Sequence, residues 1–174
     1  MKNNTKPYIK KITYTALFVA IIAILSQISI PVSVIPITLQ TFAISLCGFT
    51  LGRKSSLVAT LAYLALGAVG APVFASFNGG FQTLLSYTGG FLWGFIPFVL
   101  LCSLTKSKLA IPFGISGLLL CHLAGIIQYS LVSDTTVWLA FLVVSLPYLI
   151  KDIILVILAY FLSTRINKII KKHL

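Results

Sequence analysis

Long apolar stretches alternate along the chain with short polar segments that carry the basic residues. Twelve of the thirteen lysines and arginines fall into four clusters, at residues 2–11, 53–54, 106–108 and 165–172. The apolar stretches between successive clusters span roughly 40 to 60 residues, and about 40 residues suffice for two membrane crossings joined by a short turn. Each stretch therefore predicts a pair of transmembrane helices, and three pairs give six spans.

The basic clusters also predict the orientation of the chain. Lysine and arginine are enriched in loops on the cytoplasmic side of a membrane. In a six-span chain all four clusters lie on one side, and the three turns on the other side contain no basic residue. We therefore expect the N- and C-termini to be cytoplasmic.

Proline, glycine and the basic clusters set the expected helix ends. Pro31 and Pro36 interrupt the helical pattern, so residues 31–37 form the first outer loop. A second, longer outer loop is rich in glycine and begins at Gly70, and the next helix starts at Gln82 or at Gly89. The first five expected spans are residues 12–30, 38–51, 55–69, 82 or 89 to 104, and 109–131.

The last apolar segment contains Pro147 near its middle. Proline is favoured in the first turn of a helix and disfavoured inside one. We therefore predict a short interfacial or re-entrant piece from Asp134 to Leu146 and a helix from Pro147 to Thr164, with one continuous helix as the alternative. Eighteen residues at about 1.5 Å each span roughly 27 Å, enough for a crossing.

Composition agrees with an all-α membrane protein. Hydrophobic residues make up 59% of the chain and charged residues 9%, and glutamate is absent. The net charge of +11 could indicate a nucleic-acid partner, but basic residues at the ends of apolar segments are typical of membrane anchors that contact lipid headgroups. With 174 residues the chain predicts one integral membrane domain, residues 1–174, and no separate catalytic domain.

One pair of charges lies inside an expected span. Lys151 and Asp152 fall about five residues into the last helix, roughly 8 Å from its outer end. A charge within a span costs about 2.5–3.5 kcal/mol on insertion scales and usually faces a cavity or a partner. We expect Asp152 to face the interior and to accept hydrogen bonds from the N–H groups of a solute. The alternative is that Lys151 snorkels outward and Asp152 satisfies a helix N-terminus.

Further polar groups and flexible glycines occur at the same depth. An apolar pocket with a few convergent polar groups is typical of a small-molecule site, although each residue alone could serve a loop or a helix cap. The candidates are Thr38, Gln40, Asn78, Gly79, Gln82, Tyr87 and Thr88. The GxxxG patterns at Gly48–Gly52 and Gly90–Gly94 more often indicate tight helix packing than ligand contact.

Cysteine and histidine do not form a recognisable reactive site. Cys47, Cys102 and Cys121 are far apart and have neither metal-ligand nor disulfide spacing. Cys121 adjoins His122, but neighbours on a helix point about 100° apart, which suits a nucleophile and its base poorly. We interpret His122 as a hydrogen-bonded residue between helices, with a proton relay as the alternative. An intramembrane enzyme that uses these residues or Asp152 is the rival functional class.

Four segments together resemble the BioY family, the biotin-binding S components of energy-coupling factor (ECF) transporters. They are PITLQT from Pro36, GAVGAPVFA from Gly67, YTGGFLWG from Tyr87, and Pro147 followed by Asp152. The resemblance implies a six-helix protein that captures biotin on the outer side and docks on a transmembrane coupling subunit driven by two ABC ATPases. It implies no cofactor, no metal and no ATP hydrolysis by the chain itself, which also lacks a Walker A pattern. An S component for another vitamin is the nearest alternative.

The resemblance also implies particular residue roles. Asp152 would take the ureido N–H groups of biotin, and Ala16 and Ala20 match a small-residue motif that implies the docking face, although both could instead pack inside the monomer. The family usually carries a lysine three residues after the aspartate, and here that position is Leu155. Lys151 could replace it only if the helix were locally rotated or unwound, because it points about 100° away.

Overall fold

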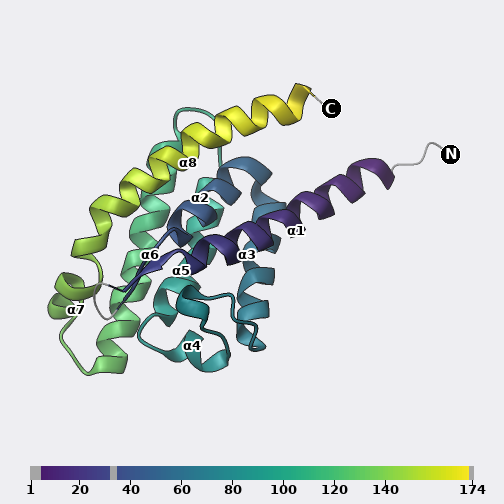
Figure 1. Ribbon diagram of the computed structural model, residues 1–174. Coiled ribbons are helices and arrows are strands. Elements are labelled where there is room, and N and C mark those ends of the chain that lie inside the picture. The colour runs from purple at the N-terminus through teal and green to yellow at the C-terminus, as the bar shows by residue number, and fades with distance from the viewer. Residues whose placement is uncertain (1–4, 32–34, 173–174) are drawn as a thin grey trace.

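The structure is a computed structural model that describes residues 5–31 and 35–172, and it is a bundle of helices with one small hairpin (Figure 1). The elements follow the chain in this order: α1 (Thr5–Gln27), β1 (Ser29–Ile30), β2 (Ile37–Thr38), α2 (Gln40–Leu51), α3 (Arg53–Ala68), a 3₁₀ turn η1 (Ala75–Phe77), α4 (Phe81–Leu85), α5 (Gly89–Cys102), α6 (Ala110–Ser133), α7 (Val137–Val144) and α8 (Leu146–Lys172).

Three of the described helices are long and apolar enough to cross a membrane by length and composition. They are residues 9–27 of α1, the whole of α6, and residues 146–169 of α8. The shorter apolar helices α2 and α5 lie inside the bundle, and most of their residues are buried. Many large apolar side chains of the longer helices point outward, including Ile24, Leu131 and Ile150. An apolar exterior around a packed interior is what a bilayer requires.

The last apolar segment is divided as the proline pattern predicts. Helix α7 ends at Val144, Ser145 lies outside both helices, and α8 begins at Leu146 with Pro147 in its first turn. Helix α8 is longer than expected and continues to Lys172. Of the two starts considered for the fourth span, Gly89 is the one that begins α5, since residues 81–85 form the separate helix α4.

Two further features differ from the sequence-based expectation. Helix α1 starts at Thr5 and ends at Gln27, so it begins earlier and ends sooner than the predicted range. Residues after it form the antiparallel pair β1–β2, in which Ser29 faces Thr38, where only a loop was expected. The N-terminal half of α1 projects beyond the bundle (Figure 1).

The GxxxG glycines serve close helix packing. A Cβ atom on Gly90 would lie 2.3 Å from the backbone oxygen of Ala124, and one on Gly94 would lie 2.7 Å from the Cα of Cys121, so α5 and α6 approach closely only because these residues are glycine. Gly48 holds α2 equally close to α5. Gly52 has a different role, since its φ of 80° lets the chain turn directly from α2 into α3.

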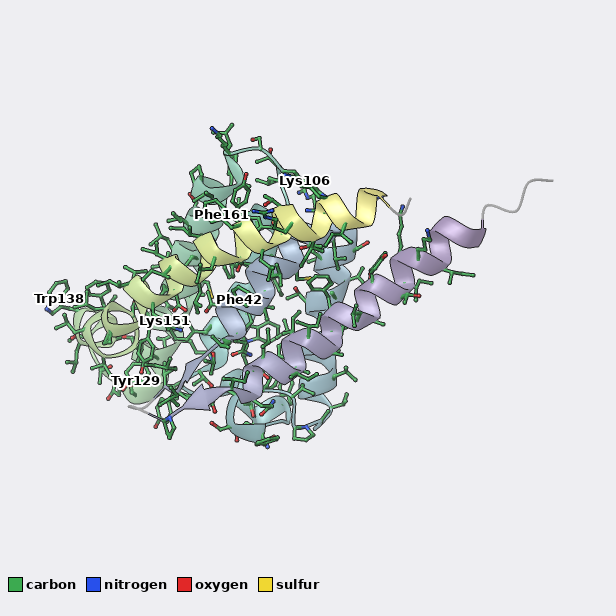
Figure 2. The ribbon with its side chains drawn as sticks, turned by 45° about the horizontal axis from the view of Figure 1, so that its top comes forward. Phe42, Lys106, Tyr129, Trp138, Lys151 and Phe161 are labelled. Atoms are coloured by element: carbon green, nitrogen blue, oxygen red, sulfur yellow. The ribbon has the colours of Figure 1, made fainter. Side chains whose placement is uncertain are left out.

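The two ends of the bundle differ in character. Lys106, just before α6, lies at one end, and Tyr129 and Trp138 lie at the other (Figure 2). The hairpin, η1, α4 and the α7–α8 corner gather at the end that holds Tyr129. At this end the connecting segments fold over the ends of the short helices. The main pocket lies among these segments and helices.

Candidate functional site

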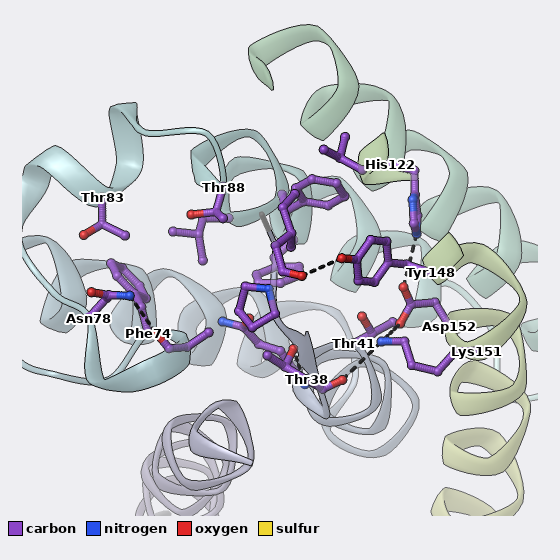
Figure 3. A pocket seen from close by; sticks show the side chains of 18 residues that line it. Thr38, Thr41, Phe74, Asn78, Thr83, Thr88, His122, Tyr148, Lys151 and Asp152 are labelled. Carbon is purple, nitrogen blue, oxygen red and sulfur yellow. Dashed lines mark hydrogen bonds and ion pairs between the residues drawn. The ribbon is translucent and has the colours of Figure 1, made fainter. Parts of the chain in front are cut away.

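A pocket of about 100 Å³ lies where the segment before α2, the loop around η1, and helices α2, α5, α6 and α8 meet (Figure 3). Residues from eight elements and their connections line it: Ile35, Pro36, Thr38, Gln40, Thr41, Phe74, Ala75, Asn78, Thr83, Thr88, Phe91, Leu92, Phe95, His122, Val144, Tyr148, Lys151 and Asp152. Six of the nine candidates that the sequence analysis names are among them, and Gly79, Gln82 and Tyr87 are not. The pocket therefore brings together residues more than 100 positions apart.

One end of the pocket carries its charge. The Lys151 Nζ lies 2.6 Å from Asp152 Oδ1, and the His122 Nε2 lies 3.3 Å from Asp152 Oδ2. Asp152 and His122 are buried, while the Lys151 side chain keeps 28% of its surface exposed. Both carboxylate oxygens of Asp152 thus face a nitrogen. These three residues form the charged end of the pocket.

Hydrogen bonds behind the carboxylate fix this arrangement. His122 Nδ1 lies 2.9 Å from Ser145 Oγ, and the imidazole stands edge-on to Phe91 with ring centroids 5.6 Å apart. Ser145 occupies the break between α7 and α8, so the corner itself supplies a partner for the histidine. A histidine ring with a defined partner on one nitrogen presents the other nitrogen in a defined role. His122 therefore orients the Asp152 carboxylate from α6.

Helix α8 also holds the segment before α2. The Tyr148 hydroxyl donates to the backbone oxygen of Ile35, and the Lys151 ammonium donates to the backbone oxygen of Thr38 at 3.2 Å. Tyr148, Lys151 and Asp152 are three and four residues apart, so they share one face of the helix. The helix is continuous through this region, and the flexible stem of Lys151 brings its ammonium back to the carboxylate of its neighbour Asp152.

The opposite end of the pocket is polar but uncharged. Asn78, Thr83 and Thr88 lie there, well separated from the charged end (Figure 3). Asn78 Nδ2 donates to the Ala75 oxygen at 2.9 Å, and Thr83 Oγ1 donates to the Gly79 oxygen at 3.0 Å. These three residues form the neutral end, and aromatic and aliphatic side chains of α5 and η1 line the space between the two ends.

A second, shallower hollow of about 440 Å³ adjoins the neutral end. It shares Pro36, Asn78, Thr83 and Thr88 with the pocket and continues over residues 82–87 of α4 and its following turn. We call it the loop hollow. Tyr87 lines this hollow and not the pocket, and its ring is half exposed beside Tyr129. The loop hollow is therefore the open continuation of the neutral end.

Two sequence candidates, Gln40 and Gly79, have structural contacts of their own. The Gln40 amide donates to the Tyr63 hydroxyl, which in turn donates to the Val73 oxygen at 3.1 Å, so this pocket residue also anchors the loop before η1. Gly79 does not line the pocket, and a Cβ there would lie 2.4 Å from the Ala71 oxygen. The close approach at Gly79 is thus between two backbone segments.

His122, Tyr148 and Thr83 were not among the ligand-binding candidates from the sequence. His122 could have been included, because an ionisable residue inside a span is a site candidate by default. Tyr148 could have been found from its position four residues before Asp152, which places both on one helix face. No local signal distinguishes Thr83 from other loop hydroxyls.

The cysteines do not form a reactive centre among the described residues. Cys121 is buried between α5 and α6, and its thiol lies 3.4 Å from the Phe91 oxygen. His122 points away from it, toward Asp152 and Ser145. Within the described chain no cluster of histidine, cysteine and acidic residues is arranged to hold a metal ion.

The docking candidates lie on the exposed side of α1. Ala16 and Ala20 are both exposed, and Ala16 lines a hollow of about 500 Å³ between α1 and α3, whereas Ala20 does not. Ile12 and Val19 of α1 and Val58 of α3 give this hollow an apolar surface, and Lys11 and Lys54 lie at one end of it. The alanines are therefore not packed inside the monomer.

Comparison with known proteins gives matches over nearly the whole chain. The chain is 33% identical to a protein of Pyrococcus horikoshii named probable biotin transporter BioY, covering 91% of this chain and 96% of that one. It is 34% identical to the biotin transporter BioY of Thermotoga maritima, covering 92% and 97%. A crystal structure of the S-component for biotin from an ECF-type ABC transporter matches with a TM-score of 0.84 and 29% identity, over 97% of this chain and 95% of that one. The model of the BioY family matches residues 1–172, and the chain belongs to that family.

Proposed function

We propose that this protein is the substrate-binding subunit of an ECF-type importer and that its ligand is biotin. The observation that carries the proposal is the agreement between full-length membership of the BioY family and a pocket with a single buried acid at one end. Biotin has a ureido group with two N–H donors at one end and a flexible acid chain at the other. A buried carboxylate facing an apolar cavity suits the first of these ends.

In this proposal Asp152 accepts the ureido N–H groups. Lys151 and His122 hold its carboxylate in place, at 2.6 Å and 3.3 Å, so that its oxygens are oriented before the ligand arrives. The fused rings lie against the aromatic side chains of α5. Thr38 and Gln40 border the ring site, and Asn78, Thr88, Tyr87 and Gly79 belong to the neutral end and to the loops that shape it.

We further propose six spans, α1, α2, α3, α5, α6 and α8, with both termini in the cytoplasm of a bacterium and the chain as one domain in its plasma membrane. The basic clusters support this orientation, since those at residues 53–54 and 106–108 lie at the α2–α3 and α5–α6 connections, the same end of each helix pair. Helix α2 has 12 residues and α5 has 14, too few for a full crossing. Irregular backbone can complete such a crossing where protein buries it, as around this pocket.

Delivery of the ligand requires a partner in this proposal. Ala16 and Ala20 form the face that docks on a transmembrane coupling subunit, which carries two ABC ATPases. The support is the exposed small-residue surface of α1 beside the apolar hollow toward α3, because small side chains let helices approach closely inside a membrane. The pocket is lined from other elements, so docking and ligand contact involve different surfaces.

A binding measurement on the purified protein tests the proposal. Protein stripped of ligand and reconstituted in nanodiscs is titrated with a panel of vitamins, including biotin, thiamine, riboflavin and folate. We expect tight binding of biotin alone. Tight binding of a different vitamin, with none of biotin, would make the protein an S component of another specificity, and binding of none would remove the proposed function.

A further inference from the structure

The main pocket contains one full positive and one full negative charge, and they neutralise each other. Apart from the imidazole of His122, Lys151 and Asp152 are the only ionisable side chains at neutral pH among the 18 described residues that line it. The remaining described lysines and arginines belong to the four basic clusters, and none of them lines the pocket or the loop hollow. Among the described residues that line these two spaces, a ligand carboxylate therefore meets no spare cation.

Lys151 cannot act at both ends of the ligand. Its ammonium lies 2.6 Å from Asp152 and 3.2 Å from the Thr38 oxygen, at the charged end of the pocket. The ring system and the carboxylate of biotin are separated by a chain of four methylene groups, roughly 6 Å when extended, since a chain advances about 1.2 Å per bond. When the ureido group lies on Asp152, the carboxylate is at the other end.

The reverse orientation is unfavourable. A ligand carboxylate placed on Lys151 would lie beside the Asp152 carboxylate, and two anions would share one ammonium. Like charges at such short distance disfavour each other strongly where water is scarce. His122 gives no relief, because its two ring nitrogens face Asp152 and Ser145.

The neutral end offers room and hydroxyl or amide groups, but no ion. Asn78, Thr83 and Thr88 lie there (Figure 3), and the described residues that line the adjoining loop hollow include no charged one. Asn78 and Tyr87 are exposed, so this end communicates with solvent. A ligand carboxylate at this end keeps part of its hydration. The affinity for the ligand therefore depends little on the charge of its carboxylate.

We propose that the pocket recognises the ureido end of its ligand through hydrogen bonds to a charged carboxylate and the acid end without an ionic partner, so that the protein also binds carboxyl-capped biotin, such as biotin amides. This inference rests on the proposed function and extends it to a wider substrate class. The specificity of the site then lies in the bicyclic ring. The acid end contributes through neutral hydrogen bonds and water.

Competition binding tests the inference on the wild-type protein in nanodiscs. Radiolabelled biotin is displaced by unlabelled biotin or by biotinamide, in which a neutral amide replaces the carboxylate. We expect the dissociation constant of biotinamide to be within about tenfold of that of biotin, because the acid has no ionic partner to lose. If the acid did have an ionic partner, replacing it by an amide would weaken binding by about tenfold or more. A larger difference would overturn the inference. Absence of biotin binding would instead overturn the proposed function, so the two failures are distinct.

The variant Lys151→Met separates the two possible roles of the lysine. If Lys151 acts through Asp152, the substitution weakens biotin and biotinamide by the same factor, within about threefold. If the substitution lowers the affinity for biotin by over about tenfold more than the affinity for biotinamide, Lys151 contacts the acid and the inference is wrong. Should the variant fail to fold, the comparison of the two ligands on the wild-type protein still decides.

Discussion

Replacement of Asp152 by asparagine is the most direct test of the charged end. Both carboxylate oxygens face nitrogen donors, Lys151 Nζ at 2.6 Å and His122 Nε2 at 3.3 Å. Asparagine keeps the shape but turns one acceptor into a donor, so an N–H group then faces another N–H group. The remaining oxygen must serve Lys151 and the ligand together.

The expected magnitude follows from these contacts. A hydrogen bond to a charged group contributes about 1.5–3 kcal/mol, against about 1 kcal/mol for a neutral one. A loss of about 1.5 kcal/mol lowers affinity about tenfold, and the mismatched donor adds to it. We therefore expect Asp152→Asn to weaken biotin by at least about tenfold, measured by competition with radiolabelled biotin on protein in nanodiscs.

The chain provides a matched control, because it contains only one other acid. Asp134 lies outside the pocket, caps the C-terminal end of α6 in the left-handed conformation with φ of 49°, and is exposed. Asparagine adopts that conformation readily, so Asp134→Asn should fold normally and bind biotin like the wild type. Biotin affinity within twofold of wild type in Asp152→Asn would refute the proposed hydrogen bonds between the Asp152 carboxylate and the ureido group.

Three further predictions concern other parts of the molecule. His122→Ala should weaken biotin about tenfold by releasing Asp152, and His122→Gln should restore most of the affinity because its amide can donate to the same carboxylate; equal losses would indicate a packing role only. Ala16→Leu should block uptake in cells while leaving the affinity of the isolated protein within a few-fold, and loss of binding by the isolated protein would contradict the separation of the docking face from the pocket. A cysteine at Ser76 should react with an impermeant thiol reagent added to intact cells, and one at Ser107 only after permeabilisation; labelling of position 107 in intact cells would contradict the six-span topology.

The sequence predicts helices well here because their signals are local. Basic clusters mark one end of each helix pair, and Pro147 marks the start of α8 within a few residues. The β1–β2 pair was missed because two-residue strands leave no periodic pattern and form only through pairing across the loop. The early start of α1 was also missed, since residues 5–11 are polar enough to look like a loop.

The site divides in the same way. Lys151 and Asp152 were predictable because charges inside an apolar span are rare. His122 was interpreted as a hydrogen-bonded residue between helices, and that is confirmed by its contacts, yet its partner Ser145 lies 23 residues along the chain and nothing local connects them. The ion pair between Lys151 and Asp152 was not predicted, because the angle between neighbouring side chains on a helix does not limit where a long, flexible side chain ends.

The contact between Lys151 and Asp152 has a consequence for how the protein enters the membrane. The two residues are neighbours in α8, so their ion pair forms within one helix and needs no other element. Inserted separately, each charge would cost about 2.5–3.5 kcal/mol, whereas a paired helix carries no net charge at this point into the bilayer. Helix α8 can thus be integrated before the bundle assembles around it. Without Lys151, Asp152 would have to enter the membrane as an unpaired anion. The amount of protein in the membrane should then fall, and so should its affinity for biotin.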